Sequence, residues 1–397
     1  MINKFTVEKA FFISSLLFAF LIPIAKVPAN IAMTIFIITG LLLAKKYHID
    51  FRNTVSQPLI KPLIVFFSII LVTVPFSINV LKSFHEYVRM LSYVLPFVIF
   101  VILKSVKEEM RININFIFDS YLYGCIISGL YAIYQYIHTK QLYVTSFFGH
   151  HAIFGSYLET ALPIIVVLLL RELSFRKKIV YLFSGVICFI ALILTQARGP
   201  WIGTLFALLT IACIMRKHIA ANKRIVMVGI TIIAAIIFLM MPLYIERIKT
   251  ITDISWFSNY HRLLIWESTL NMIKDYPGTG VGLGQFITVY NEQYISPLSL
   301  ERWHPHAHNS YLMLCVESGI GALLAFIYLL FKIGQLLFSL LRSKQCSNYV
   351  VAYTGIFVAI IINSLVDNFF WSPYVSKMLW LMLGLIVYEG HSAQNGS

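Results

Sequence analysis

Charged residues are scarce in this 397-residue sequence, because Asp, Glu, Lys and Arg make up only 12% of it and hydrophobic residues make up 59%. A mean hydropathy of +0.81 excludes a soluble globular protein and is typical of a helical membrane protein with many spans. The five cysteines show neither a pairing pattern nor the spacing of metal ligands. A disulfide framework and a cysteine metal site are therefore not expected.

Long apolar runs recur along the chain, and each can cross roughly 30 Å of hydrocarbon as a helix of about 17–25 residues. They predict an all-α polytopic membrane protein with about twelve transmembrane helices, which together form one integral membrane domain over residues 1–397. The expected spans are 9–25, 28–44, 60–78, 88–103, 114–137, 153–170, 179–196, 200–215, 225–243, 319–341, 350–366 and 373–389.

Lysines and arginines gather in alternate connections between these spans, and the intervening connections are much poorer in them. The basic connections are 45–58, 104–113, 171–178, 216–224 and 342–349. Positive charge is retained on the cytoplasmic side, so both termini are expected in the cytoplasm and residues 244–317 outside. The formal net charge of +14 then reports on topology, and no nucleic-acid partner is expected.

The polar segment 244–317, between the ninth and tenth expected spans, is predicted to form a lid at the outer membrane surface. Residues 262–273 show helical spacing of apolar residues, which predicts an amphipathic helix lying on the bilayer. Arg262 and Trp266 are four residues apart and share a face of that helix. They could bind substrate or serve only as an interfacial anchor.

Two further arginines are expected at the outer surface. Arg198 stands in a connection of very few residues between two spans, and Gly199-Pro200 fixes the backbone beside it. This setting suits binding of a phosphate that enters from the outer leaflet, although a snorkelling arginine is the alternative. Arg89, in the first turns of the fourth expected span, could line the same electropositive mouth or anchor its helix.

The glycine-rich run 276–286 has the composition of a nucleotide-binding loop. No strand precedes it, no Gly-Lys-Ser/Thr follows it, and it is expected outside the cytoplasm. A tight turn is the better interpretation.

Three alternating histidines, His304, His306 and His308, would share one face of an extended segment and could hold Zn²⁺. No cysteine or clear carboxylate set completes the ligands, so no metal is expected. Asn309 and the residues after it are predicted to open a helix that breaks at Gly319. His308, at the start of that helix, could take a proton from a hydroxyl group at neutral pH, or be a solvated surface histidine.

These motifs together resemble the O-antigen ligase/polymerase superfamily of bacterial membrane glycosyltransferases. The resemblance is carried by Thr-Gln-Ala-Arg-Gly-Pro-Trp at 195–201, Arg-Leu-Leu-Ile-Trp at 262–266, the glycine-rich run at 276–286, and His308-Asn309 followed by Gly319. It covers roughly residues 140–390. The Gly-Ile-Gly spacing after the helix is narrower than the family often has, which concerns helix packing more than chemistry.

The resemblance implies a metal-independent, inverting glycosyltransferase of GT-C-like fold in the bacterial inner membrane, with its active site on the periplasmic face and no cofactor. The donor would be a glycan on undecaprenyl diphosphate, and the acceptor a lipid A–core sugar in lipopolysaccharide biosynthesis. His308 would be the general base, and Arg198 and Arg262 would bind the diphosphate leaving group. Asn309, Trp266 and Arg89 are expected to contact substrate.

Two alternatives remain open. A polymerase of the same superfamily would add repeats to a growing glycan instead, and would need the same lipid-diphosphate site, base and acceptor groove. The compact length and the full motif set favour the ligase. A flippase or transporter of lipid-linked glycan is disfavoured, because transporters commonly carry internal repeats and polar residues near the midplane, whereas here the polar residues gather at one face.

Overall fold

The computed structural model describes the chain apart from residues 1–3, 51, 111, 142, 224–226, 228, 230, 232–243, 246–247, 301–302, 344–345 and 391–397. Within the described residues all regular structure is helical. The helices long and apolar enough to cross a membrane are α2 (Lys26–Lys46), α5 continued by η2 and α6 (Val80–Met110), α7 (Ile114–Thr139), α8 (His151–Arg171), α9 (Phe175–Thr195) and α15 (Ser310–Arg342).

Shorter helices complete the described fold. The apolar ones are α4 with η1 (Ile60–Phe76), α10 (Arg198–Ile214) and α16 (Asn348–Asn363), and α1 (Lys4–Leu21) and α17 (Val375–Glu389) lie at the two ends of the chain. The remainder are α3 (Arg52–Val55), η3 (Ser146–Phe148), α11 (Arg216–Ala221), α13 (Phe257–Asp275), α14 (Phe286–Val289) and η4 (Tyr290–Tyr294).

The expected all-α, multi-span class is therefore confirmed. The number of twelve spans stays a prediction, because the span expected at 225–243 lies largely outside the described residues.

Aromatic side chains form much of the helical core. Phe11 of α1 stacks on Phe36 of α2 with ring centroids 5.0 Å apart, and Phe36 meets Phe100 of α5 at 5.5 Å. Gly384 of α17 allows that helix to approach α5 closely, since a β-carbon there would lie 2.9 Å from the Cα of Phe97. Small residues at helix contacts are a usual means of packing inside membranes.

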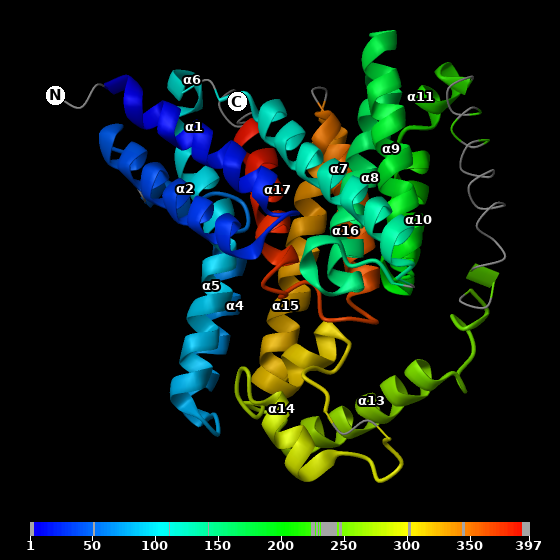
Figure 1. Cartoon of the computed structure of the whole chain (residues 1–397). Helices are drawn as coiled ribbons and strands as arrows, with labels where there is room; N and C mark the ends of the chain where they lie inside the picture. The colour runs from blue at the N-terminus through cyan, green and yellow to red at the C-terminus, as the bar shows by residue number, and fades with distance from the viewer. Residues whose placement is uncertain are drawn as a thin grey trace.

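Helix α15 folds back on itself at Gly319, whose φ of 81° and ψ of 172° are not helical. The first arm runs from Ser310 to Ser318 and the second from Ile320 to Arg342 (Figure 1). The rings of Tyr311 and Phe326 lie 6.0 Å apart. In a straight helix these positions would be separated by about 22 Å, so the two arms must lie side by side. The expected start of this helix and its break at Gly319 are confirmed.

The glycine-rich run satisfies the backbone groups that this break leaves open. The N–H groups of Val281 and Gly282 donate to the carbonyls of Val316 and Glu317, both at 2.9 Å. These carbonyls end the first arm and have no partner within it, which is the general problem of helix C-termini. The expected tight turn is confirmed, and its backbone donors bond the protein itself.

Helix α13 packs its buried side chains Ile265 and Met272 in a small core with Val316 of α15. The expected helix over 262–273 is confirmed, and Leu263 and Leu270 on its other side are exposed. In Figure 1, α13 lies at the end of the molecule opposite α6 and α11, and α11 carries the basic residues Arg216 and Lys217. The division into one membrane domain with a lid at 244–317 stays a prediction.

Candidate active site

A tight turn carries the predicted base. His308 adopts a left-handed backbone conformation with φ of 48°, which is uncommon outside glycine. Its N–H donates to Nδ1 of His306 at 3.3 Å, and the two imidazole rings are 4.2 Å apart. The indole N–H of Trp266 donates to the carbonyl of Ala307 at 3.0 Å. Helix α13 therefore fixes this turn, named here the histidine turn (residues 306–308), from one side.

The side chain of Asn309 connects the histidine turn to α15 and to the chain after α16. Its Oδ1 accepts from the N–H groups of Tyr311 and Leu312 at 2.9 and 3.0 Å, so it caps the helix. Its Nδ2 donates to the carbonyl of Leu365 at 3.0 Å. Ser310 adds two bonds to the same stretch, from its N–H to the Ser364 carbonyl at 2.8 Å and from its Oγ to the Asp367 carbonyl at 3.1 Å.

These bonds bring a carboxylate to the predicted base. Oδ1 of Asp367 lies 3.6 Å from Nδ1 of His308, and both side chains are largely buried. Burial alone would raise the pKa of Asp367, but the neighbouring His308, with smaller contributions from His306 and Arg262, outweighs it and holds the pKa well below its usual range. The Asp367 side chain is thus an anion beside the imidazole, at a distance that a small adjustment would turn into a hydrogen bond.

Asp367 is not among the site residues that the sequence predicts, because it lies outside the polar segment 244–317. A usable signal existed: it follows directly on the expected span 350–366, and a charge at the edge of a span was the criterion that singled out Arg198.

His306 shares this cluster. Burial lowers the pKa of His306 to about 4, with the nearby charge of His308 acting in the same direction. The imidazole of His306 is therefore neutral at pH 7 and serves the turn as a hydrogen-bond acceptor. His304 lies elsewhere, with its ring 5.9 Å from Tyr290 and 6.5 Å from His261. The expected common face of three histidines is wrong, because the chain bends at residues 305–306 and is not extended there, so that only His306 and His308 lie together.

Arg262 reaches the same cluster from α13. Its positive charge contributes to lowering the pKa values of both His306 and Asp367, which places the guanidinium close to them. It stands one helical turn before Trp266, the residue that holds the histidine turn. The sequence prediction that Arg262 and His308 converge therefore agrees with the geometry, while the substrate role of Arg262 stays a prediction.

Arg198 lies at the start of α10 and is largely buried. Its Nη1 donates to the carbonyl of Thr250 and its Nη2 to Oγ of Ser258, both at 2.6 Å, so it holds the beginning of α13. The next residue, Gly199, packs against Asn363, since a β-carbon there would lie 2.3 Å from Asn363 Oδ1. The start of α10 thus joins α13 to Asn363 at the end of α16, which is four residues before Asp367. The contact of Arg198 with diphosphate stays a prediction.

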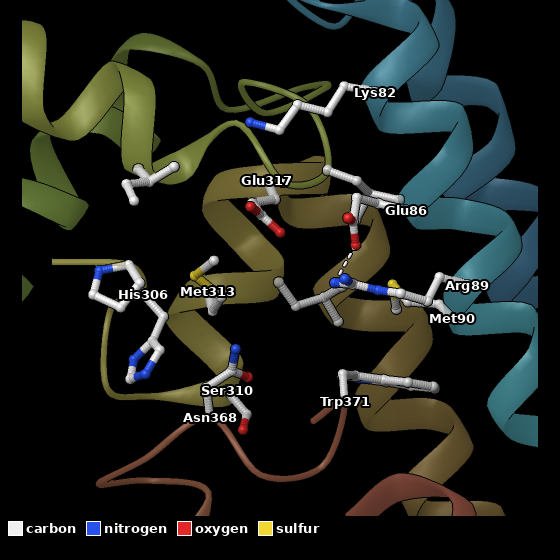
Figure 2. A pocket seen from close by; sticks show the side chains of 15 residues that line it. Lys82, Glu86, Arg89, Met90, His306, Ser310, Met313, Glu317, Asn368 and Trp371 are labelled. Atoms are coloured by element: carbon white, nitrogen blue, oxygen red, sulfur yellow. Dashed lines mark ion pairs between the residues drawn. The ribbon is translucent and has the colours of Figure 1, made fainter. Parts of the chain in front are cut away.

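Arg89 lies on α5, away from the histidine turn. It forms an ion pair with Glu86 one turn earlier on α5, and both side chains line a cavity of about 340 Å³ (Figure 2). His306 lies on the opposite side of this cavity from them. The sequence prediction placed Arg89 at the diphosphate, and the structure places it in the wall of this cavity.

His306, His308 and Asp367 also have the composition of a metal site, because ligand atoms from all three lie within 4.8 Å of one another. Two histidines and one carboxylate are ligands that Zn²⁺ accepts. The expectation of a site without metal therefore stays a prediction that needs a direct test.

Fold and site together define a polytopic helical membrane protein that places a histidine–carboxylate pair beside a guanidinium group at one end of the helix bundle. Residues 183–327 match the family model described as O-antigen ligase, and this match includes Arg198, Arg262 and His308. Over this region the resemblance drawn from the motifs is confirmed.

Two curated proteins are similar to part of the chain. One is a "Putative polysaccharide ligase" from Rickettsia felis, 29% identical over 129 residues, and the other bears the same description in Rickettsia conorii, 29% identical over 128 residues. Each match covers 31% of this chain and 30% of the relative. The chain thus aligns with less than a third of the length of these relatives.

Proposed function

We propose that this protein is an inverting glycosyltransferase of the O-antigen ligase type, which moves a polysaccharide from undecaprenyl diphosphate to a sugar hydroxyl of lipid A–core at the periplasmic membrane face. The proposal rests first on one observation, the pairing of His308 with Asp367 next to the charge of Arg262. The family match and the printed names of the relatives support the ligase reaction.

In this mechanism His308 is the general base. Its Nδ1 faces Asp367, which favours the tautomer with the proton on Nδ1 and leaves Nε2 to accept the proton of the acceptor hydroxyl. The acceptor oxygen forms a bond to the anomeric carbon while the bond to the diphosphate oxygen breaks, and the diphosphate leaves with the electron pair. Asp367 stabilises the imidazolium that forms. A positioned base of this kind contributes about 10²–10⁴ in rate.

The leaving diphosphate carries the negative charge that develops. Arg262, beside the histidine turn, and Arg198, at the start of α10, supply the positive charge in this proposal. Arginine can hold a phosphate through two parallel hydrogen bonds, each worth about 1.5–3 kcal/mol. This positive charge takes the role that a divalent metal has in many glycosyltransferases.

Replacement of the base tests the mechanism. We expect His308→Ala protein to insert in the membrane at the normal level and to lose glycan transfer, by at least about 10²-fold. Asp367→Asn should lower kcat and leave the KM for donor nearly unchanged, because it acts through His308. Normal transfer by the His308→Ala protein would exclude this residue as the base.

A ligase and a polymerase differ in the acceptor, so one experiment separates them. Purified protein is given lipid-diphosphate glycan together with lipid A–core in one tube, and lipid-diphosphate glycan alone in a second. Glycan attached to lipid A–core in the first tube identifies the ligase. Longer chains in the second tube identify the polymerase, and absence of both products contradicts the proposed function.

A further inference from the structure

The cavity between α5 and the first arm of α15 is lined by charged side chains of both signs. Lys82, Glu86 and Arg89 of α5 form one wall, and Glu317 of α15 points into the space from another (Figure 2). Its volume of about 340 Å³ lies in the range of small-molecule sites, roughly 300–1,000 Å³. Gly284 keeps one edge open, because a β-carbon there would meet the side chain of Glu86 at 2.8 Å.

The chemistry of this lining suits a polyhydroxylated ligand. Carboxylates accept hydrogen bonds from hydroxyl groups, and guanidinium and ammonium groups donate to hydroxyl oxygens. Glu86 and Arg89 already pair with each other, so they offer a fixed acceptor and donor side by side. One oxygen of the Glu317 carboxyl group accepts from the N–H of Phe286 at 3.4 Å, and the group borders the cavity, where it can hydrogen-bond a ligand hydroxyl. Charges of both signs would not select strongly for an anion.

The cavity lies next to the proposed base and apart from the two arginines that are proposed to bind the diphosphate. His306, Ser310 and Asn368 all line it, and they stand within two residues of His308 or next to Asp367 in the sequence. None of the residues that line it belongs to α10 or α13, the helices of Arg198 and Arg262. In an inverting transfer the attacking hydroxyl and the leaving group lie on opposite sides of the reacting carbon. The acceptor therefore needs a position near the base and away from the arginines that hold the diphosphate.

We propose that this cavity is the acceptor subsite, in which Glu317, Glu86 and Arg89 hold the hydroxyl groups of the acceptor sugar ring and present one of them to His308. The inference rests on the proposed function. It assigns Arg89 to the acceptor in place of the diphosphate that the sequence suggested, and it gives Glu86 and Glu317 a role in selecting the acceptor glycan.

Two variants test the subsite by different means. Glu317→Gln keeps the shape of the side chain and replaces its carboxyl group with an amide, and Ile287→Trp fills the space from a half-buried position in the lining. Each should raise the KM for acceptor at least about 10-fold, with the KM for donor unchanged. Glu317→Gln alters a hydrogen bond to the acceptor, and the indole of Ile287→Trp occupies the space of its sugar ring. Glu267→Gln on the exposed side of α13 and Leu324→Trp on the exposed side of α15 are matched controls with unchanged KM values.

Binding without turnover separates this inference from the proposed function. Core oligosaccharide from rough lipopolysaccharide, or lipid-linked repeat unit if the wild-type protein extends that glycan, is titrated calorimetrically into folded His308→Ala protein. Binding that Ile287→Trp abolishes in this background supports the subsite even if transfer fails. Equal binding with and without Ile287→Trp, no binding at all, or a rise in the donor KM alone would overturn it.

Discussion

His308 is held in its left-handed conformation by contacts to its own turn. The bond from its N–H to His306 and the bond from Trp266 to the Ala307 carbonyl both fix the peptide group that precedes His308. A non-glycine residue in this region costs of order 1–3 kcal/mol and persists only when its surroundings determine it. Trp266, expected from the sequence to contact substrate, thus has a clear second task, which is to place the imidazole.

The geometry of the guanidinium group is predicted to matter at Arg262. We expect Arg262→Ala to lower kcat/KM for donor on the order of 10²-fold and Arg262→Lys to restore little of it, since an ammonium lacks the planar fork. Arg216→Lys on the exposed helix α11 is the control and should have no effect. A fully active Arg262→Lys protein would reduce this residue to a membrane anchor. Arg198 variants need a melting curve as well, because Arg198 also bonds Thr250 and Ser258.

The neutral state of His306 gives a pH dependence of stability. Its pKa is lowered by burial from 6.5 to about 4, so the unfolded chain binds more protons than the folded one between these values. Acidification from pH 7 to 5 should therefore destabilise the fold, with a slope approaching ~1.4 kcal/mol per pH unit for this single group.

Thermal melting in detergent at several pH values measures this slope. The His306→Asn protein should show a smaller slope, whereas His218→Asn, at an exposed position of α11, should match the wild-type protein. Identical slopes in all three proteins would show that His306 does not titrate below its usual range.

Arginine and histidine sites could be predicted from the sequence because charge stands out in an apolar chain. The partner of the base could not, since Asp367 lies 59 positions after His308 and meets it only through bonds from Asn309 and Ser310 to residues 364–367. Contacts of that kind depend on how α16 ends beside α15, and no local pattern reports it.

At the scale of elements, the break in α15 was predictable and its consequence was not. Glycine after a polar helix start suggested where the helix would end. The direction of the second arm depends on the glycine-rich turn, whose N–H groups bond the carbonyls of Val316 and Glu317. The two motifs appeared in the sequence as separate features, but in the fold each completes the hydrogen bonding of the other.

Gly319 is predicted to tolerate no side chain. Its φ of 81° is strained for other residues, and a β-carbon would lie 2.0 Å from the carbonyl oxygen of Gly278. We expect Gly319→Ala to destabilise the protein by about 2 kcal/mol or more and to reduce transfer, because the cavity and the histidine turn both depend on this break.

The matched control is two residues away. Gly321 is helical, and a β-carbon there would have its nearest neighbour at 3.7 Å. Gly321→Ala should therefore be neutral or stabilising by up to ~1 kcal/mol in a thermal or denaturant unfolding measurement. Equal behaviour of the two variants would argue against the fold-back of α15.

At the scale of the whole molecule, hydropathy predicted the helical class well because every span must satisfy its backbone groups internally. The arrangement in Figure 1 sets α13 at one end and α6 and α11 at the other. This agrees with the expected separation of a cytoplasmic and a periplasmic face, which topology mapping with terminal and loop reporters can test.

Metal independence is a prediction about the complete site. His306, His308 and Asp367 could bind a metal ion, yet the proposed reaction needs His308 as a free base. Transfer should therefore be undiminished in excess EDTA, and added Zn²⁺ should inhibit if it occupies these ligands. A strict requirement for Zn²⁺ or Mg²⁺, lost on chelation and restored on addition, would replace the base mechanism with a metal-assisted one.

The cavity wall comes from α5 and α15, whereas Arg198 and Arg262 come from α10 and α13. Because different helices form the two subsites, donor and acceptor can bind at the same time. The glycan can then pass directly from donor to acceptor, and the reaction needs no glycosyl-enzyme intermediate. Initial rates measured against one substrate at several fixed levels of the other should then give intersecting lines in a double-reciprocal plot, the pattern of a ternary complex, and not the parallel lines of a ping-pong enzyme.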